Sequence, residues 1–207
     1  KAVTPIAISS FTAAAVADKF FGGEQVFITE IIEMDLINFI PIAISGGLFF
    51  GFIALIYMQA LNKGPQFSTK IKIKPNQLIY LGALFCGIIG IAYPEVLGIG
   101  TNTINNMLNV QIDTQTVLIF LFLKIMLTAI CLSTGFFGGV FSPAIFVGAA
   151  SGIVFASFIS LFGIIADIKA LALCGMASVG ASVIGTPIAG VILVIELSNS
   201  YDLGVIS

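Results

Sequence analysis

The feature of this sequence that most limits its fold is a series of long apolar runs with few charges inside them. The runs are long enough to cross, or nearly cross, a hydrocarbon core about 30 Å thick, and they lie at roughly 2–21, 36–61, 77–93, 116–132, 141–165 and 170–197. Backbone inside a bilayer must satisfy its own hydrogen bonds, which leaves helices or closed barrels. Because the runs are continuous and do not alternate with the two-residue period of a barrel strand, they predict an all-α, polytopic membrane protein.

The last apolar run is interrupted near its middle. It contains Gly180, Gly185 and Pro187, and Thr186 is biased away from helix because a proline follows it. We therefore predict two shorter helices that meet near Gly185.

Glycines recur at spacings of about four residues in several runs. Small residues at this spacing let helix backbones approach closely in lipid, where packing drives association. The pattern predicts a tightly packed bundle, and it is formed by Gly47 and Gly51, by Gly82, Gly87 and Gly90, by Gly148 and Gly152, and by Gly175 and Gly180.

The composition excludes several classes of function. Of the 207 residues, 58% are hydrophobic and 9% charged, against about a quarter charged in soluble domains. Histidine is absent and every basic residue is a lysine, so the commonest metal ligand and general base are missing. With no set of paired carboxylates or nucleophile and base, we expect neither an enzyme nor a metal or other cofactor. The net charge of -2 gives no cationic cluster for nucleic acid.

The three cysteines, Cys86, Cys131 and Cys174, each stand alone in an apolar run. They lack metal-ligand spacing and an even count, so we predict small buried hydrophobic side chains.

The charges outside the runs are separated by sign. Four lysines and no acidic residue occur at 63–76, whereas four acidic residues and no lysine occur at 22–35. The positive-inside tendency predicts that the 63–76 loop is cytoplasmic and that the 22–35 loop lies on the opposite side. Since the sequence starts at Lys1 without Met and stops at Ser207 within what resembles another apolar segment, we expect a fragment of a longer protein.

The stretch from Cys131 to Gly148 is the part most informative about function. An apolar helix leads into a loop with Gly135, Gly138 and Gly139, and a second apolar segment follows with too few polar residues between to reach bulk water. The loop is therefore predicted at membrane depth, where non-helical backbone is tolerated only if it is buried in protein or lines a wet cavity. This predicts broken and re-entrant helices.

Gly138 and Gly139 can adopt dihedrals closed to other residues and let a ligand approach the main chain. Pro143 fits the first turn of a helix, where a missing N–H costs nothing. Together they predict a helix that begins near Phe141.

The amides of Val140, Phe141 and Ser142 would then lack intrahelical acceptors and carry the positive end of the helix dipole, about half a charge. Such a helix start attracts an anion without a full positive charge. Partial charges also let the ion leave again, as conduction requires.

Three motifs in order resemble those of the CLC family of voltage-gated chloride channels and chloride/proton antiporters. Residues 138–143, Gly-Gly-Val-Phe-Ser-Pro, resemble its G-x-F-x-P anion-site motif. Residues 93–100 resemble its P-E-x-x-G-x-G turn before a short helix, and residues 185–197 are similar to its P-x-x-G-x-x-x-x-x-E helix. The resemblance extends over essentially the whole chain.

The resemblance implies a single transmembrane domain fragment over 1–207, in which 1–21 is a helix of the first inverted half and 36–207 is most of the second half. It implies chloride or a similar small anion as transported ligand, a lipid bilayer as surroundings and a homodimer in which each subunit has its own pore. It further implies that the N–H groups of Val140 and Phe141 coordinate chloride, and that Phe136 and Phe137 replace a small or polar pair. The residues that distinguish a channel from an exchanger would lie outside this sequence.

Two alternatives stay open. Lys124 lies within an apolar run, where an ionised side chain costs at least about 2.5 kcal/mol, so it must face a wet cavity, snorkel or find a partner. It either raises the local anion concentration or serves as a structural partner for a carbonyl or for a carboxylate such as Glu95 or Glu196. A different function for the whole protein also stays open, namely a cation-coupled carrier with broken helices in which the same loop binds a substrate carboxylate.

Overall fold

Apolar helices form the structure, as the long runs predict. The computed structural model describes residues 3–21, 36–70, 75–109, 111–164 and 166–198, and these ranges contain no strand. The helices are α1 (Val3–Phe21), α2 (Leu36–Lys70), α3 (Pro75–Ala92), the 3₁₀ turn η1 (Pro94–Val96), α4 (Thr101–Leu108), α5 (Thr114–Thr134), α6 (Phe141–Ser160), α7 (Ile168–Ile184) and α8 (Pro187–Ser198). The prediction of an all-α protein is confirmed.

Only some of these helices are long and apolar enough to cross a bilayer. Within the described ranges they lie at Phe39–Gln66, Thr114–Thr134 and Phe141–Ser160, in α2, α5 and α6. The apolar helices at Gln77–Ala92, Ile168–Ile184 and Pro187–Glu196 are shorter, and the last two are the two short helices predicted for the final run.

Helix α2 extends beyond its predicted end at residue 61 to Lys70, so the first part of the predicted 63–76 loop is helical. Gly64 explains why the helix continues past Pro65. A Cβ at Gly64 would collide with the Ser133 hydroxyl and lie 3.1 Å from the Ala129 carbonyl, so α2 packs directly on α5 there. This packing outweighs the breaking tendency of a Gly-Pro pair. Residues 71–74 of that loop and the whole 22–35 loop lie outside the described residues.

The predicted break near Gly185 is confirmed. Helix α7 ends at Ile184, and Gly185 adopts a left-handed φ of 75° while its N–H donates to the Ala181 carbonyl at 2.8 Å. Pro187 then begins α8. The run at 141–165 ends early for a similar reason, because α6 stops at Ser160 and a turn with Gly163 at a φ of 77° follows.

The closest helix packing joins α6 and α7. A Cβ at Gly148 would lie 2.6 Å from the Met176 Cα, and a Cβ at Gly152 would collide with the Leu171 carbonyl. Gly175 in turn meets the Gly148 carbonyl. The glycine spacing therefore correctly predicts close helix packing here, whereas Gly47, Gly51 and Gly87 have no atom within 4 Å of a Cβ position and have no such role among the described residues.

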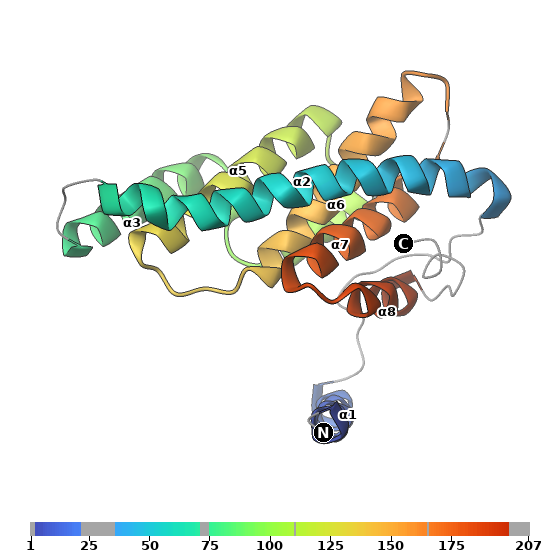
Figure 1. Cartoon of the computed structure of the whole chain (residues 1–207), viewed down its shortest axis with the longest axis horizontal. Coiled ribbons are helices and arrows are strands. Elements are labelled where there is room, and N and C mark those ends of the chain that lie inside the picture. Colours follow the sequence, from blue (N-terminus) through green and yellow to red (C-terminus); the bar gives the residue numbers. More distant parts are fainter. Residues whose placement is uncertain (1–2, 22–35, 71–74, 110, 165, 199–207) are drawn as a thin grey trace.

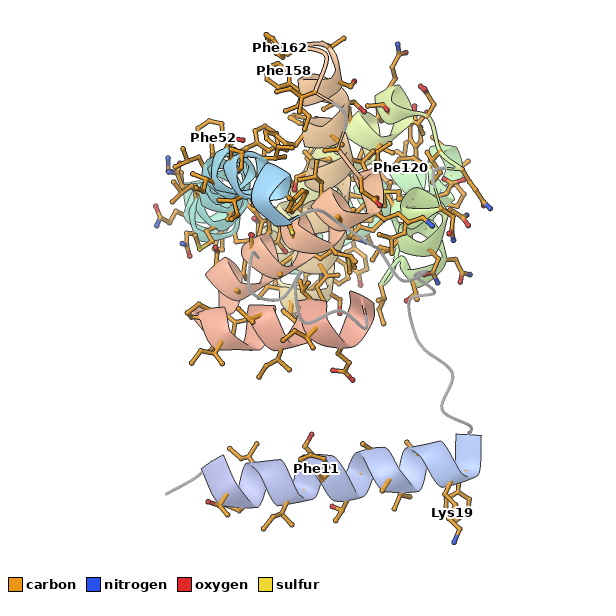
Figure 2. All side chains as sticks on the ribbon, turned by 90° about the vertical axis from the view of Figure 1, so that its right-hand side faces the viewer. Phe11, Lys19, Phe52, Phe120, Phe158 and Phe162 are labelled. Carbon is orange, nitrogen blue, oxygen red and sulfur yellow. The ribbon has the colours of Figure 1, made fainter. Side chains whose placement is uncertain are left out.

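Figure 1 shows α2 running along the molecule beside α5, α6 and α7. Figure 2 shows α1 apart from these helices, and each side chain described on it is exposed. The buried core lies mainly on α6 and α7, so the loop that joins α5 to α6 ends on a well-packed helix.

Candidate functional site

The loop between α5 and α6 begins with a tight helix end. Gly135 adopts a φ of 95°, the Phe136 N–H donates to the Cys131 carbonyl at 3.0 Å, and the Gly135 N–H donates to the Leu132 carbonyl at 3.4 Å. These two bonds form a Schellman motif, which satisfies the last carbonyls of a helix and needs a glycine at the left-handed position. The left-handed glycine is thus Gly135.

Neither Gly138 nor Gly139 has a φ in the left-handed region, so the backbone freedom of these two glycines is not used for a left-handed turn here. The chain has already turned at Gly135 and needs no second left-handed residue. The second half of the prediction agrees with the structure, since no atom lies within 4 Å of a Cβ position on either glycine. Their backbone is therefore open to a ligand.

Helix α6 begins at Phe141 with Pro143 in its first turn, as predicted. Val140 precedes the helix, its carbonyl accepts the Ala144 N–H at 3.1 Å, and no side chain caps this end. In the described part of the chain the N–H groups of Val140, Phe141 and Ser142 donate to no protein acceptor. The helix therefore presents its first amides unpaired, at the positive end of its dipole.

Tyr57 on α2 holds this helix start in place, a role that the sequence analysis missed. Its side chain is fully buried, and its hydroxyl donates to the Val140 carbonyl at 2.9 Å. In a trans peptide the carbonyl and the following N–H point in opposite directions, so this bond also orients the Phe141 N–H away from Tyr57. A lone tyrosine in an apolar helix was the available clue, because a buried phenol needs a hydrogen-bond partner.

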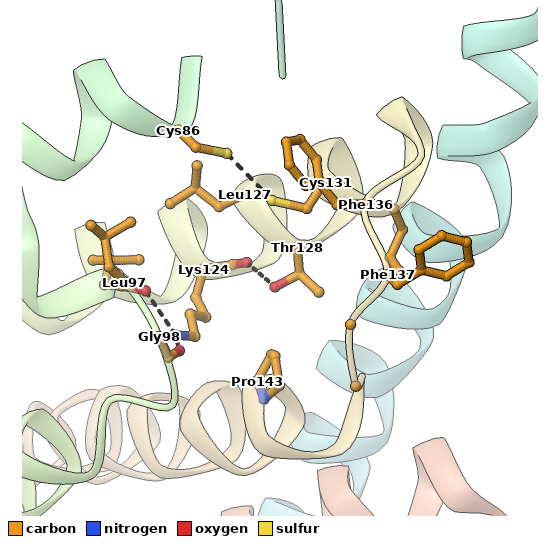
Figure 3. Close-up of a pocket in the computed structure, with 14 residues that line it drawn as sticks. Cys86, Leu97, Gly98, Lys124, Leu127, Thr128, Cys131, Phe136, Phe137 and Pro143 are labelled. Atoms are coloured by element: carbon orange, nitrogen blue, oxygen red, sulfur yellow. Dashed lines mark hydrogen bonds between the residues drawn. The ribbon is translucent and has the colours of Figure 1, made fainter. Parts of the chain in front are cut away.

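A cavity of about 320 Å³ lies beside the loop. It is bounded by η1 and the residues after it, by the second half of α5, by Cys86 of α3 and by the loop itself (Figure 3). Of the predicted site residues, Gly138, Gly139 and Pro143 line the cavity, whereas Val140, Phe141 and Ser142 do not. The open glycine backbone thus faces this cavity, whereas Phe141 lines a separate pocket together with residues of α7 and α8.

Lys124 forms the charged part of the cavity wall. It is 3% exposed, its Nζ donates to the carbonyls of Val96 and Gly98 at 2.7 Å each, and it lies 4.7 Å from the centroid of the Phe146 ring. Of the partners considered for Lys124, the structure thus shows backbone carbonyls. Figure 3 shows the lysine extended toward Gly98.

The turn that Lys124 holds is the P-E-x-x-G-x-G segment, which leads into α4 as expected from the resemblance. Gly98 and Gly100 adopt left-handed φ values of 61° and 77°. The Thr103 hydroxyl donates to the Glu95 carbonyl at 3.0 Å, and a Cβ at Gly100 would lie 2.8 Å from the Phe146 ring. Lysine, glycine and ring contacts therefore fix this turn against α5 and α6.

The aromatic residues around the loop differ in position. Phe136 and Phe137 both line the cavity, but Phe137 is fully exposed and its ring points away from Lys124 in Figure 3. Phe141 is 37% exposed, and its ring lies 3.3 Å from a Cβ position on Gly180 of α7. The Phe141 ring therefore packs partly against α7.

The cysteine prediction holds for one residue of three. Cys174 is buried, but Cys86 and Cys131 are only partly buried, line the cavity and contact each other. Their separation of 45 positions hides this contact in the sequence, because only the packing of α3 on α5 brings them together.

Comparison with known proteins agrees with this architecture. The family model described as voltage gated chloride channel matches residues 1–206. A putative chloride channel protein ClcB-like from Ralstonia nicotianae is 25% identical over 205 residues, which cover 96% of this chain and 47% of the relative. The H⁺/Cl⁻ exchange transporter ClcA of Klebsiella pneumoniae is 30% identical over 120 residues, which cover 57% of this chain and 25% of the relative.

Two solved structures share the fold. A CLC-type fluoride/proton antiporter superposes with a TM-score of 0.72 at 24% identity, covering 93% of this chain and 49% of that one. A slow cyanobacterial Cl⁻/H⁺ antiporter superposes with a TM-score of 0.75 at 22% identity, covering 93% and 46%. The chain thus spans about half the length of these proteins or less. With the family model matching nearly every residue, the chain is a membrane protein that belongs to the voltage-gated chloride channel family.

Proposed function

We propose that the protein containing this chain moves chloride or a similar small inorganic anion across a lipid bilayer, and that the N–H groups of Val140 and Phe141 hold the ion. The observation that carries the proposal is the uncapped start of α6, whose first amides have no acceptor among the described residues. Helix starts with free amides bind anions because donors and dipole act together.

The surroundings of the helix start support a transported ion. Gly138 and Gly139 leave room beside the main chain, and the Lys124 ammonium adds a positive charge to the wall of the adjoining cavity. Lys124 is already bonded to two carbonyls, so it attracts anions from a distance without competing for direct contact. Weak, partial-charge ligands let an ion leave as readily as it enters.

The rest of the ion path belongs to the part of the protein outside this chain. The relatives in the comparison are about twice as long or longer, and we assign 36–207 to most of the second inverted half and 1–21 to a helix of the first. A homodimer with one pore per subunit completes this proposal. The family match favours it over a cation-coupled carrier of organic carboxylates.

The orientation in the bilayer is a further part of the proposal. We place the lysine-rich end of α2 and the segment after it, 63–76, in the cytoplasm and 22–35 on the other side. A cysteine introduced at Glu30 should react with an impermeant maleimide added to intact cells, whereas a cysteine introduced at Lys63 should react only in inside-out vesicles. Labelling of both from one face would reverse the assignment of one loop.

Anion flux tests the proposed function directly. Full-length protein in chloride-loaded liposomes should release chloride when valinomycin lets potassium accompany it, and chloride-driven uphill proton movement would identify an exchanger. Residues 1–207 alone should give no flux, because the other wall of the path is missing. If the full-length wild-type protein carries no flux of chloride, nitrate or fluoride, the proposal is overturned.

A backbone substitution tests the ion site. Replacing the Val140 amide by an ester removes its N–H and keeps its side chain. We expect chloride to bind roughly tenfold to hundredfold more weakly, because a hydrogen bond to a charged group contributes about 1.5–3 kcal/mol. Titration calorimetry on the full-length protein measures the change.

The matched control is an ester at Ala144, whose N–H is already used by the Val140 carbonyl. It should lower stability slightly and leave chloride affinity unchanged. Equal chloride affinity in the Val140 ester and the wild type would show that this amide does not hold the ion.

A further inference from the structure

We propose that Cys86 and Cys131 form a modification site, at which a small peroxide converts the two thiols into a disulfide that ties α3 to the end of α5. Their Sγ atoms lie 3.3 Å apart and share a hydrogen bond. Figure 3 shows the two side chains pointing toward each other across the cavity wall. This site is separate from the amides of the proposed ion site.

The helices are close enough at this place to carry a disulfide. Ile79, Gly82 and Cys86 fall on one face of α3, and that face packs on the last turn of α5. A Cβ at Gly82 would lie 2.8 Å from the Thr134 Cβ, and a Cβ at Gly135 would lie 3.7 Å from the Ile79 side chain. A disulfide needs Cα atoms about 4.4–6.8 Å apart, and close approach of the two helices on this face favours such a spacing.

The thiols need only a small movement to bond. The sulfur atoms must approach from 3.3 Å to about 2 Å. Rotation about the Cα–Cβ bonds shifts a sulfur atom by more than this difference.

An oxidant can reach the pair from the cavity. Both cysteines are partly buried and line the space of about 320 Å³, which is much larger than a peroxide molecule. Cys174 is 3% exposed and is not among the lining residues. Cys174 therefore serves as an internal control thiol that the oxidant should not reach from the cavity.

The reaction balances with hydrogen peroxide as the only co-reactant. One thiol, as its thiolate, attacks a peroxide oxygen, breaks the O–O bond and becomes a sulfenic acid, while hydroxide leaves and takes up the thiol proton as water. The second thiol attacks the sulfenic sulfur, the S–S bond forms, and a second water leaves. Two thiols are oxidised by two electrons, and one peroxide is reduced to two waters.

The disulfide would act on the loop that follows Cys131. The Cys131 carbonyl accepts the Phe136 N–H in the helix end that starts this loop. A link to α3 therefore fixes the point from which the loop runs to Gly138 and Gly139. Oxidation should therefore lower anion flux, an effect that rests on the proposed function.

Peptide mapping tests the modification without any transport measurement. Full-length protein is treated with hydrogen peroxide, its remaining thiols are alkylated, and the digest is analysed by mass spectrometry. We expect a peptide pair joined through Cys86 and Cys131 that dithiothreitol separates, with Cys174 alkylated. Alkylation of both thiols, or their separate oxidation to sulfinic acids, would overturn the proposal.

Flux measurements test the consequence. Peroxide should reduce flux by the wild type, with recovery in dithiothreitol, and Cys174→Ser should respond in the same way. Cys86→Ser and Cys131→Ser should keep their flux in peroxide, which also shows that the loss needs both thiols. If the cross-link forms but flux is unchanged, only the inferred effect of the disulfide on flux is overturned. If there is no flux before oxidation, the result counts against the proposed function.

Discussion

Gly152→Ala should abolish recovery of folded protein. A Cβ at this position would collide with the Leu171 carbonyl and the Ala172 Cα of α7, and neither backbone atom can rotate away. Alanine gains about 1 kcal/mol of helix propensity over glycine. Overpacking costs about 1–3 kcal/mol where side chains can adjust, and more where they cannot. The free-energy cost of the clash therefore exceeds the gain in helix propensity, and α6 has to separate from α7.

The matched control is Gly87→Ala on α3, where no atom lies within 4 Å of the new Cβ. This substitution makes the same change of side chain and should raise stability by up to about 1 kcal/mol through helix propensity. Size-exclusion chromatography of heated full-length protein measures both. A Gly152→Ala protein that elutes and melts like the wild type would show that α6 and α7 are not packed backbone to backbone.

Features governed by local chain chemistry were predictable from the sequence. Pro143 and Pro187 mark the starts of α6 and α8, and Gly185 ends α7, because the dihedral preferences of these residues act within one turn. The open amides near Phe141 follow from the same local argument. What they bind depends on residues outside the chain, so the ion itself stays a proposal.

The distant partner that a residue meets through tertiary packing was not predictable. Helix α2 continues past Gly64 because α5 fits against that glycine, and the contact of Cys86 with Cys131 joins two helices far apart in sequence. The Tyr57 bond to the Val140 carbonyl likewise spans 83 positions. No pattern within one helix specifies which distant residue faces it.

Lys124→Met should release the turn between α3 and α4. The substitution keeps an unbranched stem that ends at the ε carbon, but it leaves the carbonyls of Val96 and Gly98 without a donor. A buried acceptor left unpaired costs about 1–3 kcal/mol. Removing the buried ammonium also removes its desolvation cost, but the carbonyl of the buried Val96 loses its donor, so we expect the loss to dominate.

Hydrogen exchange detects this release directly. The Leu97 N–H donates to the Pro94 carbonyl at 3.1 Å within the turn, so its exchange should speed up in Lys124→Met. Lys63→Met removes one lysine from an exposed position on α2 and should leave the exchange of Leu97 unchanged. Wild-type exchange at Leu97 in Lys124→Met would show that the turn holds its shape without the lysine.

Lys124→Gln separates the hydrogen bonds of this residue from its charge. The amide nitrogen carries two donors, but the side chain is one atom shorter than lysine, so protection of Leu97 should persist in part and exceed that in Lys124→Met. The cavity wall then loses its positive charge, and anion binding should weaken most at low ionic strength, where charges are least screened. If Lys124→Gln binds chloride as the wild type does at every salt concentration, the lysine serves only to hold the turn, and the attraction of the anion rests on the amides of α6.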